Sequence, residues 1–308
     1  MNFYSNGKLL ITGEYVVLDG AKSLAVPTKF GQDLQHKAIN EPLLVWESFS
    51  HNDSCWFEAT FDLPKLRLQT ATFSSDKEGN AEFIAENLCQ ILQEAKKMNP
   101  SFLETNQGCV IKTKMTFPRD WGLGSSSTLI NNIAQWAKVD AYQLLRNTFS
   151  GSGYDIANAQ FNTPILYQLK NQKPTVETVN FSPNFSNELF FVHLNKKQNS
   201  REGILKYREN KQEIEKHILR ISQISSAMLH VNSLSEFRNL IEEHEQIISS
   251  IIQLKPVKER LFSDYDGAIK SLGAWGGDFV LATGNQNSID YFTKKGYSTI
   301  LSYSDMVL

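Results

Sequence analysis

Hydrophobic and polar positions alternate with two different periods along this chain. In the first half, β-rich stretches predict strands joined by a tight turn across residues 8–30, and further strands at LLVWESF (43–49) and CWFEATF (55–61). The alternating run CVIKTKMTF predicts a strand at 109–117, which Pro118 ends. Apolar residues at helical spacing predict a helix between Ala81 and Met98.

The second half is richer in helical patterns. It predicts helices at about 140–148 and after the Gly-Ser turn of SGSGYDIANAQF (150–161), strand character at 164–181, and a buried strand at 188–194. Residues 201–253 are mostly helical, and 263–283 predict a helix, a glycine cluster and a strand. Strands followed by helices favour an α+β fold over a doubly wound α/β fold, with a boundary somewhere in 160–190.

Composition narrows the classes of function. The chain has 308 residues, 41% hydrophobic and 21% charged, as expected for a soluble globular protein of one large or two medium domains. Its 31 basic and 33 acidic residues give a net charge of -2, which argues against a nucleic-acid partner. The sequence has no apolar run that could span a membrane and no secretory signal pattern, so we expect a cytoplasmic protein without a membrane partner.

The cysteines do not suggest a special site. Cys55, Cys89 and Cys109 are odd in number, far apart and without a C-x-x-C pair. A disulfide framework or a cysteine-rich zinc site is therefore not expected, and a reducing compartment fits best. We expect them to be small buried hydrophobic residues.

One stretch, DWGLGSSSTL (120–129), has more small polar residues than a turn needs. Serine and threonine cap helix N-termini, which would explain one hydroxyl. Alternatively, glycines and a helix start expose N–H groups that bind a phosphate. The stretch alone leaves both interpretations open.

Three other stretches are framed by glycines: NGKLLITGEYVVLDGA with Lys8, GSGYDIA with Asp155, and GAWGGDF at 273–279. Singly, each has an ordinary explanation: a surface lysine, a helix-start aspartate and a tight turn. Together with the Gly-Ser loop they suit phosphoryl transfer. That reaction requires a phosphate cradle, a cation and a group that orients or deprotonates the attacking hydroxyl.

These four stretches, in this order, resemble the GHMP kinase superfamily, named for galactokinase, homoserine kinase, mevalonate kinase and phosphomevalonate kinase. GKLLITGEYVVLDGA resembles its first motif, GLGSSS its second and GAWGGD its third. GSGYDIA resembles the segment that holds the catalytic aspartate in mevalonate and phosphomevalonate kinases, and GYDIA matches a bacterial subgroup known by that tag. The resemblance extends from residue 7 to about residue 284.

The resemblance implies a two-part α+β fold. The N-terminal part, residues 1–165, would bind ATP and resemble domain 2 of ribosomal protein S5, and the C-terminal part, 166–308, would be ferredoxin-like. It also implies which residues cradle the triphosphate of ATP: Gly122, Leu123, Gly124, Ser125, Ser126 and Ser127.

Catalytic roles follow from the same resemblance. Asp155 would be the base, or would orient the acceptor hydroxyl, and Lys8 would stabilise the alkoxide and the transferring phosphoryl group. Ser125 would be a Mg²⁺ ligand. Glu14, Tyr15 and Tyr154 would lie near the acceptor.

The chain also departs from the family pattern. Mevalonate kinases carry a magnesium-binding glutamate about ten residues before the catalytic aspartate, whereas DAYQLLRNTFSGSGYD contains only Asp140 before Asp155. The segment between the Gly-Ser loop and Asp155 is short for the family. Trp275 stands where the third motif usually has a small residue.

Lys8 and Asp155 together favour an ATP-dependent kinase of a small hydroxyl or phosphate acceptor, with mevalonate or phosphomevalonate first. A sugar kinase of the same superfamily is the alternative, and a diphosphomevalonate decarboxylase-like enzyme, which would release carbon dioxide, stays open. A catalytically silent nucleotide-binding protein is the hypothesis from a different class.

Overall fold

The computed structural model describes residues 1–73, 80–104, 107–197, 200–209 and 214–308, which form two compact units. Unit 1 comprises Met1–Gly7, Phe30–Arg119 and Gly124–Gln160, and unit 2 comprises Lys8–Lys29, Asp120–Leu123 and Phe161–Leu308. The units interleave along the chain because β1 (Asn2–Leu10) and β2 (Ser23–Ile39) each begin in one unit and end in the other. The domains expected at 1–165 and 166–308 are consecutive segments, and their boundary stays a prediction.

Unit 1 is built on a sheet in the order β5-β4-β3-β6-β2. Its strands β3 (Leu43–Phe49), β4 (Cys55–Asp62) and β5 (Arg67–Phe73) form an antiparallel meander. Strand β6 (Gly108–Met115) pairs parallel to β3 and antiparallel to the unit 1 half of β2. A parallel pair needs a crossover connection, and helix α1 (Ala81–Met98) lies within it.

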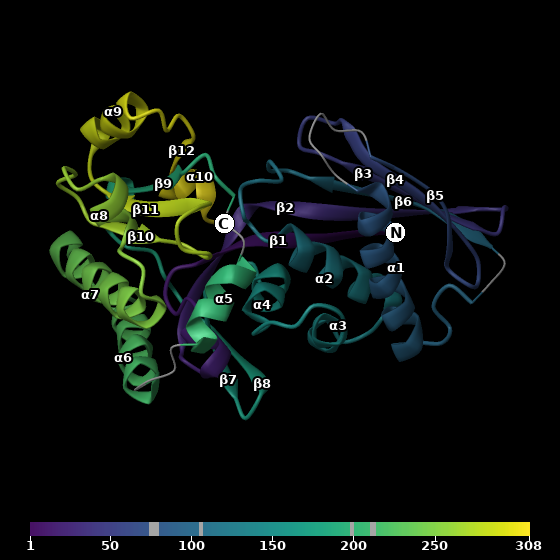
Figure 1. The fold of residues 1–308 in the computed structure, drawn as a ribbon, viewed down its shortest axis with the longest axis horizontal. Helices are drawn as coiled ribbons and strands as arrows, with labels where there is room; N and C mark the ends of the chain where they lie inside the picture. Colours follow the sequence, from purple (N-terminus) through teal and green to yellow (C-terminus); the bar gives the residue numbers. More distant parts are fainter. Residues whose placement is uncertain (74–79, 105–106, 198–199, 210–213) are drawn as a thin grey trace. The chain divides into compact units, whose positions relative to one another are not determined.

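Helices pack against this sheet: α1, α2 (Ser125–Ala137), α3 (Ala141–Thr148) and α4 (Tyr154–Gln160) (Figure 1). The apolar side chains of α1, α2 and α3 share one core with buried rings of the strands, including Trp46, Phe57 and Phe61. The Asp140 carboxylate caps α3 by accepting a hydrogen bond from the Gln143 N–H (2.9 Å). Asp140 is therefore explained by helix capping.

Unit 2 contains a second, antiparallel sheet of β9 (Leu189–His193), β10 (Ile269–Ser271), β11 (Phe279–Thr283) and β12 (Ile300–Ser302). Its spatial order is β10-β11-β9-β12, and helices separate β9 from β10 and β11 from β12 along the chain. This β-α-β-β-α-β arrangement is ferredoxin-like. It confirms the ferredoxin-like part and the α+β class.

The rest of unit 2 is mainly helical (Figure 1). A hairpin of β7 (Ile165–Lys170) and β8 (Lys173–Thr178) pairs with residues 23–25 of β2. The remaining elements are η1 (Val16–Asp19), η2 (Ser186–Glu188), α5 (Ser200–Glu209), α6 (Ile214–Ala227), α7 (Leu234–Ile252), α8 (Val257–Leu261), α9 (Gln286–Lys294) and α10 (Tyr303–Met306). None of the helices in the described ranges has the length and hydropathy needed to cross a membrane.

Most predicted elements are confirmed, including the helix at 81–98 and the strands at 43–49, 55–61, 109–117 and 188–194. The helix predicted at the start of 263–283 is wrong. Residues 269–271 form β10, in which Ile269 pairs with Ala282 and Ser271 with Val280. Residues 269–271 are compatible with a helix or a strand, and pairing with the buried strand β11 favours the strand.

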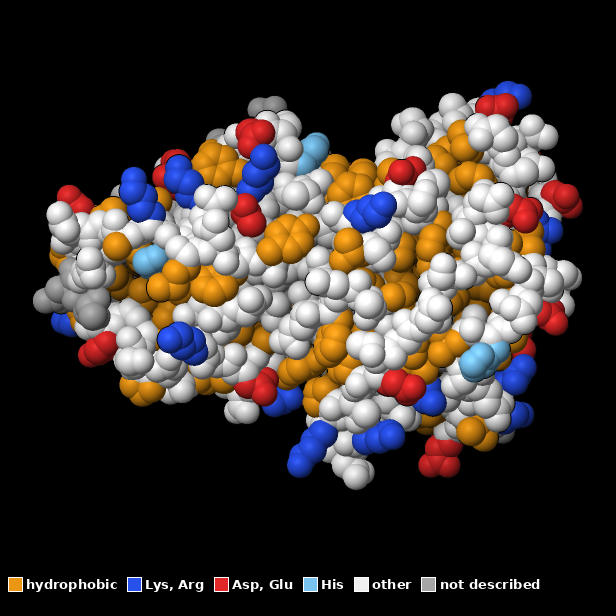
Figure 2. Space-filling view, turned by 180° about the vertical axis from the view of Figure 1, so that it is seen from behind, with side chains coloured by type: hydrophobic (Ala, Val, Ile, Leu, Met, Phe, Trp, Pro, Cys, Tyr) orange, Lys and Arg blue, Asp and Glu red, His pale blue; other side chains and the backbone are white. Residues whose placement is uncertain are grey.

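The surface and the cysteines agree with an ordinary globular protein. Figure 2 shows a face on which Lys and Arg side chains are interspersed with Asp and Glu. The absence of a nucleic-acid partner stays a prediction. Cys55, Cys89 and Cys109 are free thiols, but only Cys109 is fully buried, so the expectation that all three are buried is wrong for Cys55 and Cys89.

Candidate functional site

The Gly-Ser loop enters α2 in a conformation that requires glycine. Gly122 has φ +67° and Gly124, the N-cap residue, has φ +91°. Both angles lie in the left-handed region, where a Cβ atom is unfavourable. The sequence thus places glycine at the two positions where the loop turns into the helix.

The hydroxyls of this loop do not cap α2. Ser127 Oγ donates to the Gly124 carbonyl (2.9 Å), and Thr128 Oγ1 donates to the Ser125 carbonyl (3.0 Å) and to Gln32 Oε1 (2.7 Å). The N-cap residue Gly124 makes no side-chain cap bond in the described part of the chain, and Ser126 is exposed. The first-turn N–H groups of α2 therefore lack a side-chain cap, which favours the anion-binding interpretation over capping.

Unit 2 brings three of the four motifs together around Gly122. The Lys8 N–H donates to the Leu123 carbonyl (3.0 Å), and Lys8 Nζ donates to the Gly122 carbonyl (3.2 Å). A Cβ atom built on Gly122 would lie 2.4 Å from Cγ of Asp278, in the third motif. The predicted catalytic lysine and a carboxylate therefore both flank the loop.

Asp155 lies in unit 1, as the second residue of α4, and its side chain is half-buried. The turn before it contains Gly153, with φ +88°, and the buried Ser152. An aspartate in a first helical turn is stabilised by the helix dipole and held in place by the helix. Lys8 belongs to unit 2, so its cooperation with Asp155 stays a prediction, as does the acceptor contact of the half-buried Tyr154.

Glu14 and Tyr15, which were expected near the acceptor, are both buried in unit 2, with 1% and 8% of their surfaces exposed. Glu14 Oε1 accepts a hydrogen bond from Lys270 Nζ (2.6 Å). The Tyr15 hydroxyl accepts from the Trp275 N–H (3.2 Å), and its ring stacks on Tyr207. Contacts inside unit 2 hold both side chains, and their acceptor roles stay predictions.

Sequence reasoning missed the buried partners of Glu14. They are Lys270 in β10 and His244 in α7, and Lys270 also pairs with Glu245 of α7; each of the three is at most 3% exposed. One signal was available: His244 and Glu245 fall on the apolar stripe of α7, between Ile241 and Ile248. Polar residues on such a stripe are buried and need partners.

Burial shifts the proton affinities of these groups. It raises the pKa of Glu245 to about 7, although Lys270 counteracts it, and it raises the pKa of Glu14. Burial and the charge of Lys270 hold the pKa of His244 well below its usual range. His244 is therefore a neutral imidazole at pH 7.

The described residues contain no group of three or more His, Cys, Asp or Glu side chains arranged to hold a metal ion. A nucleotide-bound Mg²⁺ would not require one, because Mg²⁺ keeps several waters and takes phosphate oxygens with one or two carboxylates. The Ser125 hydroxyl, at the start of α2 in unit 1, is a hard oxygen donor of that kind. Its role as a ligand of a Mg²⁺ ion that arrives with the nucleotide stays a prediction.

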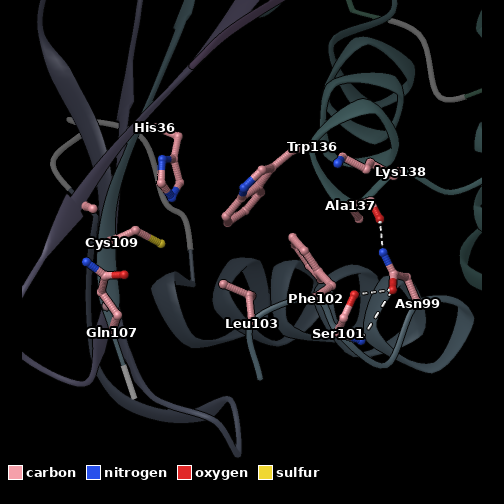
Figure 3. A pocket seen from close by; sticks show the side chains of 12 residues that line it. His36, Asn99, Ser101, Phe102, Leu103, Gln107, Cys109, Trp136, Ala137 and Lys138 are labelled. Atoms are coloured by element: carbon pink, nitrogen blue, oxygen red, sulfur yellow. Dashed lines mark hydrogen bonds between the residues drawn. The ribbon is translucent and has the colours of Figure 1, made fainter. Parts of the chain in front are cut away.

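Unit 1 also contains a cavity of about 280 Å³, which Figure 3 shows. It lies among His36, Phe102, Cys109 and Trp136, and none of the predicted site residues lines it. The Phe102 and Trp136 rings meet edge to face at 4.7 Å. Burial raises the pKa of the Cys109 thiol to about 12, so this thiol is not a nucleophile at pH 7.

Comparison with known proteins identifies the fold. No protein-family model and no curated protein matches the chain. Among solved structures, the mevalonate kinase of Methanococcus jannaschii is 15% identical over 98% of this chain and 96% of its own, with a TM-score of 0.70. This chain has the GHMP kinase fold.

Other structures with the GHMP kinase fold agree. Lactococcus lactis galactokinase, solved with galactose, is 13% identical over 100% of this chain and 93% of its own, with a TM-score of 0.68. Streptococcus pneumoniae phosphomevalonate kinase, solved with phosphomevalonate and AMPPNP, is 15% identical over 98% of this chain and 99% of its own, with a TM-score of 0.64. At these identities the likeness establishes the fold alone.

Proposed function

We propose that the protein is an ATP-dependent phosphotransferase that moves the γ-phosphoryl group of ATP to a hydroxyl or phosphate group of a small molecule. The arrangement around Gly122 carries this proposal. Lys8 Nζ lies 3.2 Å from the Gly122 carbonyl, where the loop enters a helix whose first turn has no side-chain cap among the described residues. A lysine that contacts the loop and a helix start without a side-chain cap each suit the charge of a triphosphate.

The proposed roles follow the motifs. Lys8 stabilises negative charge on the transferring phosphoryl group, and Asp155 orients or deprotonates the acceptor hydroxyl. Mg²⁺ bound with ATP would neutralise charge on the phosphate oxygens, with Ser125 as a ligand. The residues proposed to cradle the phosphates are Gly122, Leu123, Gly124, Ser125, Ser126 and Ser127.

For the acceptor, we propose mevalonate or phosphomevalonate. The Gly-Ser-Gly-x-Asp segment that ends at Asp155 supports these two, and so does the likeness to mevalonate and phosphomevalonate kinases. A sugar is the second candidate, because the likeness to a galactokinase is of similar extent.

The test is ADP release by the purified protein with Mg-ATP and, in separate reactions, mevalonate, phosphomevalonate and galactose. We expect release with one of these acceptors, and a loss of about 10²–10⁴-fold in Asp155→Asn with unchanged nucleotide affinity. Asp290→Asn, the same change at an exposed position of α9, serves as the matched control.

Wild-type turnover in Asp155→Asn would contradict the role of Asp155. Nucleotide binding without ADP release for any acceptor would point to a silent nucleotide-binding protein. Release of carbon dioxide together with ADP would point to a decarboxylase.

A further inference from the structure

Unit 2 contains a buried charge cluster, defined as Glu14, His244, Glu245, Lys270 and Ser271, each at most 3% exposed. Lys270 Nζ donates to Glu14 Oε1 (2.6 Å) and to the Ser271 carbonyl (2.8 Å), and lies 3.6 Å from Glu245 Oε1. Ser271 Oγ donates to Glu245 Oε2 (3.0 Å). The cluster thus ties together the loop after β1, helix α7 and strand β10.

Fold stability does not account for such a cluster. Each buried ion loses several kcal/mol of hydration, and replacing a buried ion pair by apolar residues is often neutral or stabilising. The atoms Glu14 Oε2, Glu245 Oε1 and His244 Nδ1 are buried and have no hydrogen-bond partner among the described residues. We therefore explain the presence of these buried charges by the backbone that they hold in place.

The cluster holds the backbone of the first motif. The Gly13 N–H donates to His244 Nε2 (2.9 Å), so this nitrogen is an acceptor and the imidazole carries its proton on Nδ1. The next residue, Glu14, accepts from Lys270 through its side chain. Two consecutive residues are therefore fixed by side chains from α7 and β10.

This backbone segment is strained and needs such support. Gly13 has φ +98°, and a Cβ atom on it would lie 2.0 Å from Ser23 Oγ. Tyr15 has φ +65°, which is uncommon for a residue with a bulky side chain. Backbone held in such conformations persists where surrounding contacts over-determine it, and it clusters at functional sites.

The cluster also reaches the proposed catalytic lysine. The charge of Lys8 lowers the pKa of Glu14, although less than burial raises it and less than Lys270 lowers it. Beyond Glu14, the Tyr15 hydroxyl meets the backbone of Trp275 in the third motif. The segment Gly13–Tyr15 of the first motif thus contacts the third motif.

We propose that Lys270 and His244 are positioning residues for phosphoryl transfer, which fix the backbone of Gly13–Tyr15 so that this loop can orient the acceptor. The proposal rests on the proposed function. Neither residue touches the substrate in this scheme. Their effect passes through Glu14 and the Gly13 N–H.

The experiment compares acceptor KM, ATP KM and turnover in variants that keep the cluster electrically balanced. Glu14→Gln with Lys270→Met removes this ion pair together, and Glu245, whose pKa burial raises and Lys270 lowers, takes up a proton once the ammonium group is gone. The matched control is Glu242→Gln with Lys258→Met, which removes the solvent-accessible pair of α7 and α8 (3.5 Å). We expect the first pair to raise the acceptor KM about tenfold or more with ATP KM within about twofold, and the control pair to change neither.

His244 gives an independent comparison. In His244→Gln the side-chain carbonyl can accept from the Gly13 N–H in place of Nε2, whereas His244→Leu leaves that N–H without a partner. We expect the leucine variant to raise the acceptor KM about tenfold and the glutamine variant to restore it to within about threefold of wild type. Amide exchange at Gly13 should be faster in the leucine variant only.

The outcomes distinguish failure of the proposed function from failure of the positioning role of Lys270 and His244. If the wild-type protein releases no ADP with any acceptor, the proposed function fails and this proposal fails with it. If the wild type is active and the folded double variant keeps the wild-type acceptor KM, only the positioning role is overturned. Should the double variant not fold, equal acceptor KM in His244→Gln and His244→Leu would overturn it.

Discussion

Two lysines of unit 2, Lys8 and Lys270, show two different uses of the same side chain. Lys8 is half-buried, and its ammonium group donates to a backbone carbonyl of the Gly-Ser loop. Lys270 is fully buried, and Glu14 and Glu245 lie within 4 Å of it. We propose that Lys8 meets an anion from outside the protein, whereas Lys270 neutralises carboxylates that the fold itself buries.

The largest expected effect is on the buried lysine. Lys270→Met should lower the free energy of unfolding by about 3–5 kcal/mol, because it leaves Glu14 buried without its counterion. Urea unfolding measures the loss. Adding Glu14→Gln to Lys270→Met should recover most of it, and a double variant as unstable as the single one would contradict the ion-pair explanation.

In contrast to Lys270→Met, Lys8→Met should lower turnover strongly and stability only slightly. We expect about 10²–10³-fold lower turnover, since Lys8 is proposed to stabilise the transferring phosphoryl group. Its free energy of unfolding should change by only about 1 kcal/mol, the contribution of one hydrogen bond to the Gly122 carbonyl. ADP release and urea unfolding of the same preparation check both statements, and a stability loss as large as that of Lys270→Met would remove the distinction between the two lysines.

The loop that Lys8 contacts can be tested through Gly122. An alanine there would meet the Asp278 carboxyl group at 2.4 Å, so either the loop or Asp278 must move. We expect Gly122→Ala to weaken AMPPNP binding about 10–100-fold in calorimetry, because the phosphate cradle loses its geometry. Gly296→Ala is the matched control, since Gly296 also has a positive φ (+90°) but open space around its Cβ position. Equal losses in the two variants would attribute the effect to backbone strain alone.

The sequence singled out the residues of the loop and, in the cluster, only Glu14, for a physical reason. Gly122, Gly124 and Lys8 lie in short motifs in which a turn and a charge are local features. The partners Glu14 and Lys270 are separated by 256 residues, and only the tertiary fold brings them together. The same limit explains the helix wrongly predicted at the start of 263–283, where pairing with β11 overrides local preference.

Whether the hydroxyl groups of the Gly-Ser loop cap α2 is a second point that the sequence could not decide. A run of serines before an apolar helix predicts a cap, and nothing local distinguishes a hydroxyl that accepts from an N–H from one that donates to a carbonyl. In the structure, Ser127 and Thr128 donate to the backbone carbonyls of Gly124 and Ser125. The sequence predicted a loop at a helix start, but it did not predict the direction of the hydrogen bonds that its hydroxyl groups make.

A further expected effect concerns the pH dependence of the cluster, through Glu245. Burial raises its pKa to about 7, whereas an unfolded glutamate titrates near 4.3. The folded protein therefore keeps a proton that the unfolded chain releases, so this group's contribution to stability is present below about pH 4.3 and is lost as pH rises through about 7. Lys270, Glu14 and Ser271 face Glu245, and it also lines a cavity of about 390 Å³ with Glu242, Lys258 and Glu259.

Glu245→Gln isolates this contribution, because the amide oxygen still accepts from Ser271 Oγ but the side chain cannot ionise. The neighbouring His244, whose pKa is lowered, acts in the opposite direction and loses stability as pH falls below about 6.5, but it is present in both proteins. We therefore expect the stability difference, variant minus wild type, to grow by about 2–3 kcal/mol between pH 5 and pH 8. Urea unfolding of both proteins at these two pH values measures it. A constant difference would mean that Glu245 is ionised throughout, and that Lys270 balances two buried carboxylates rather than one.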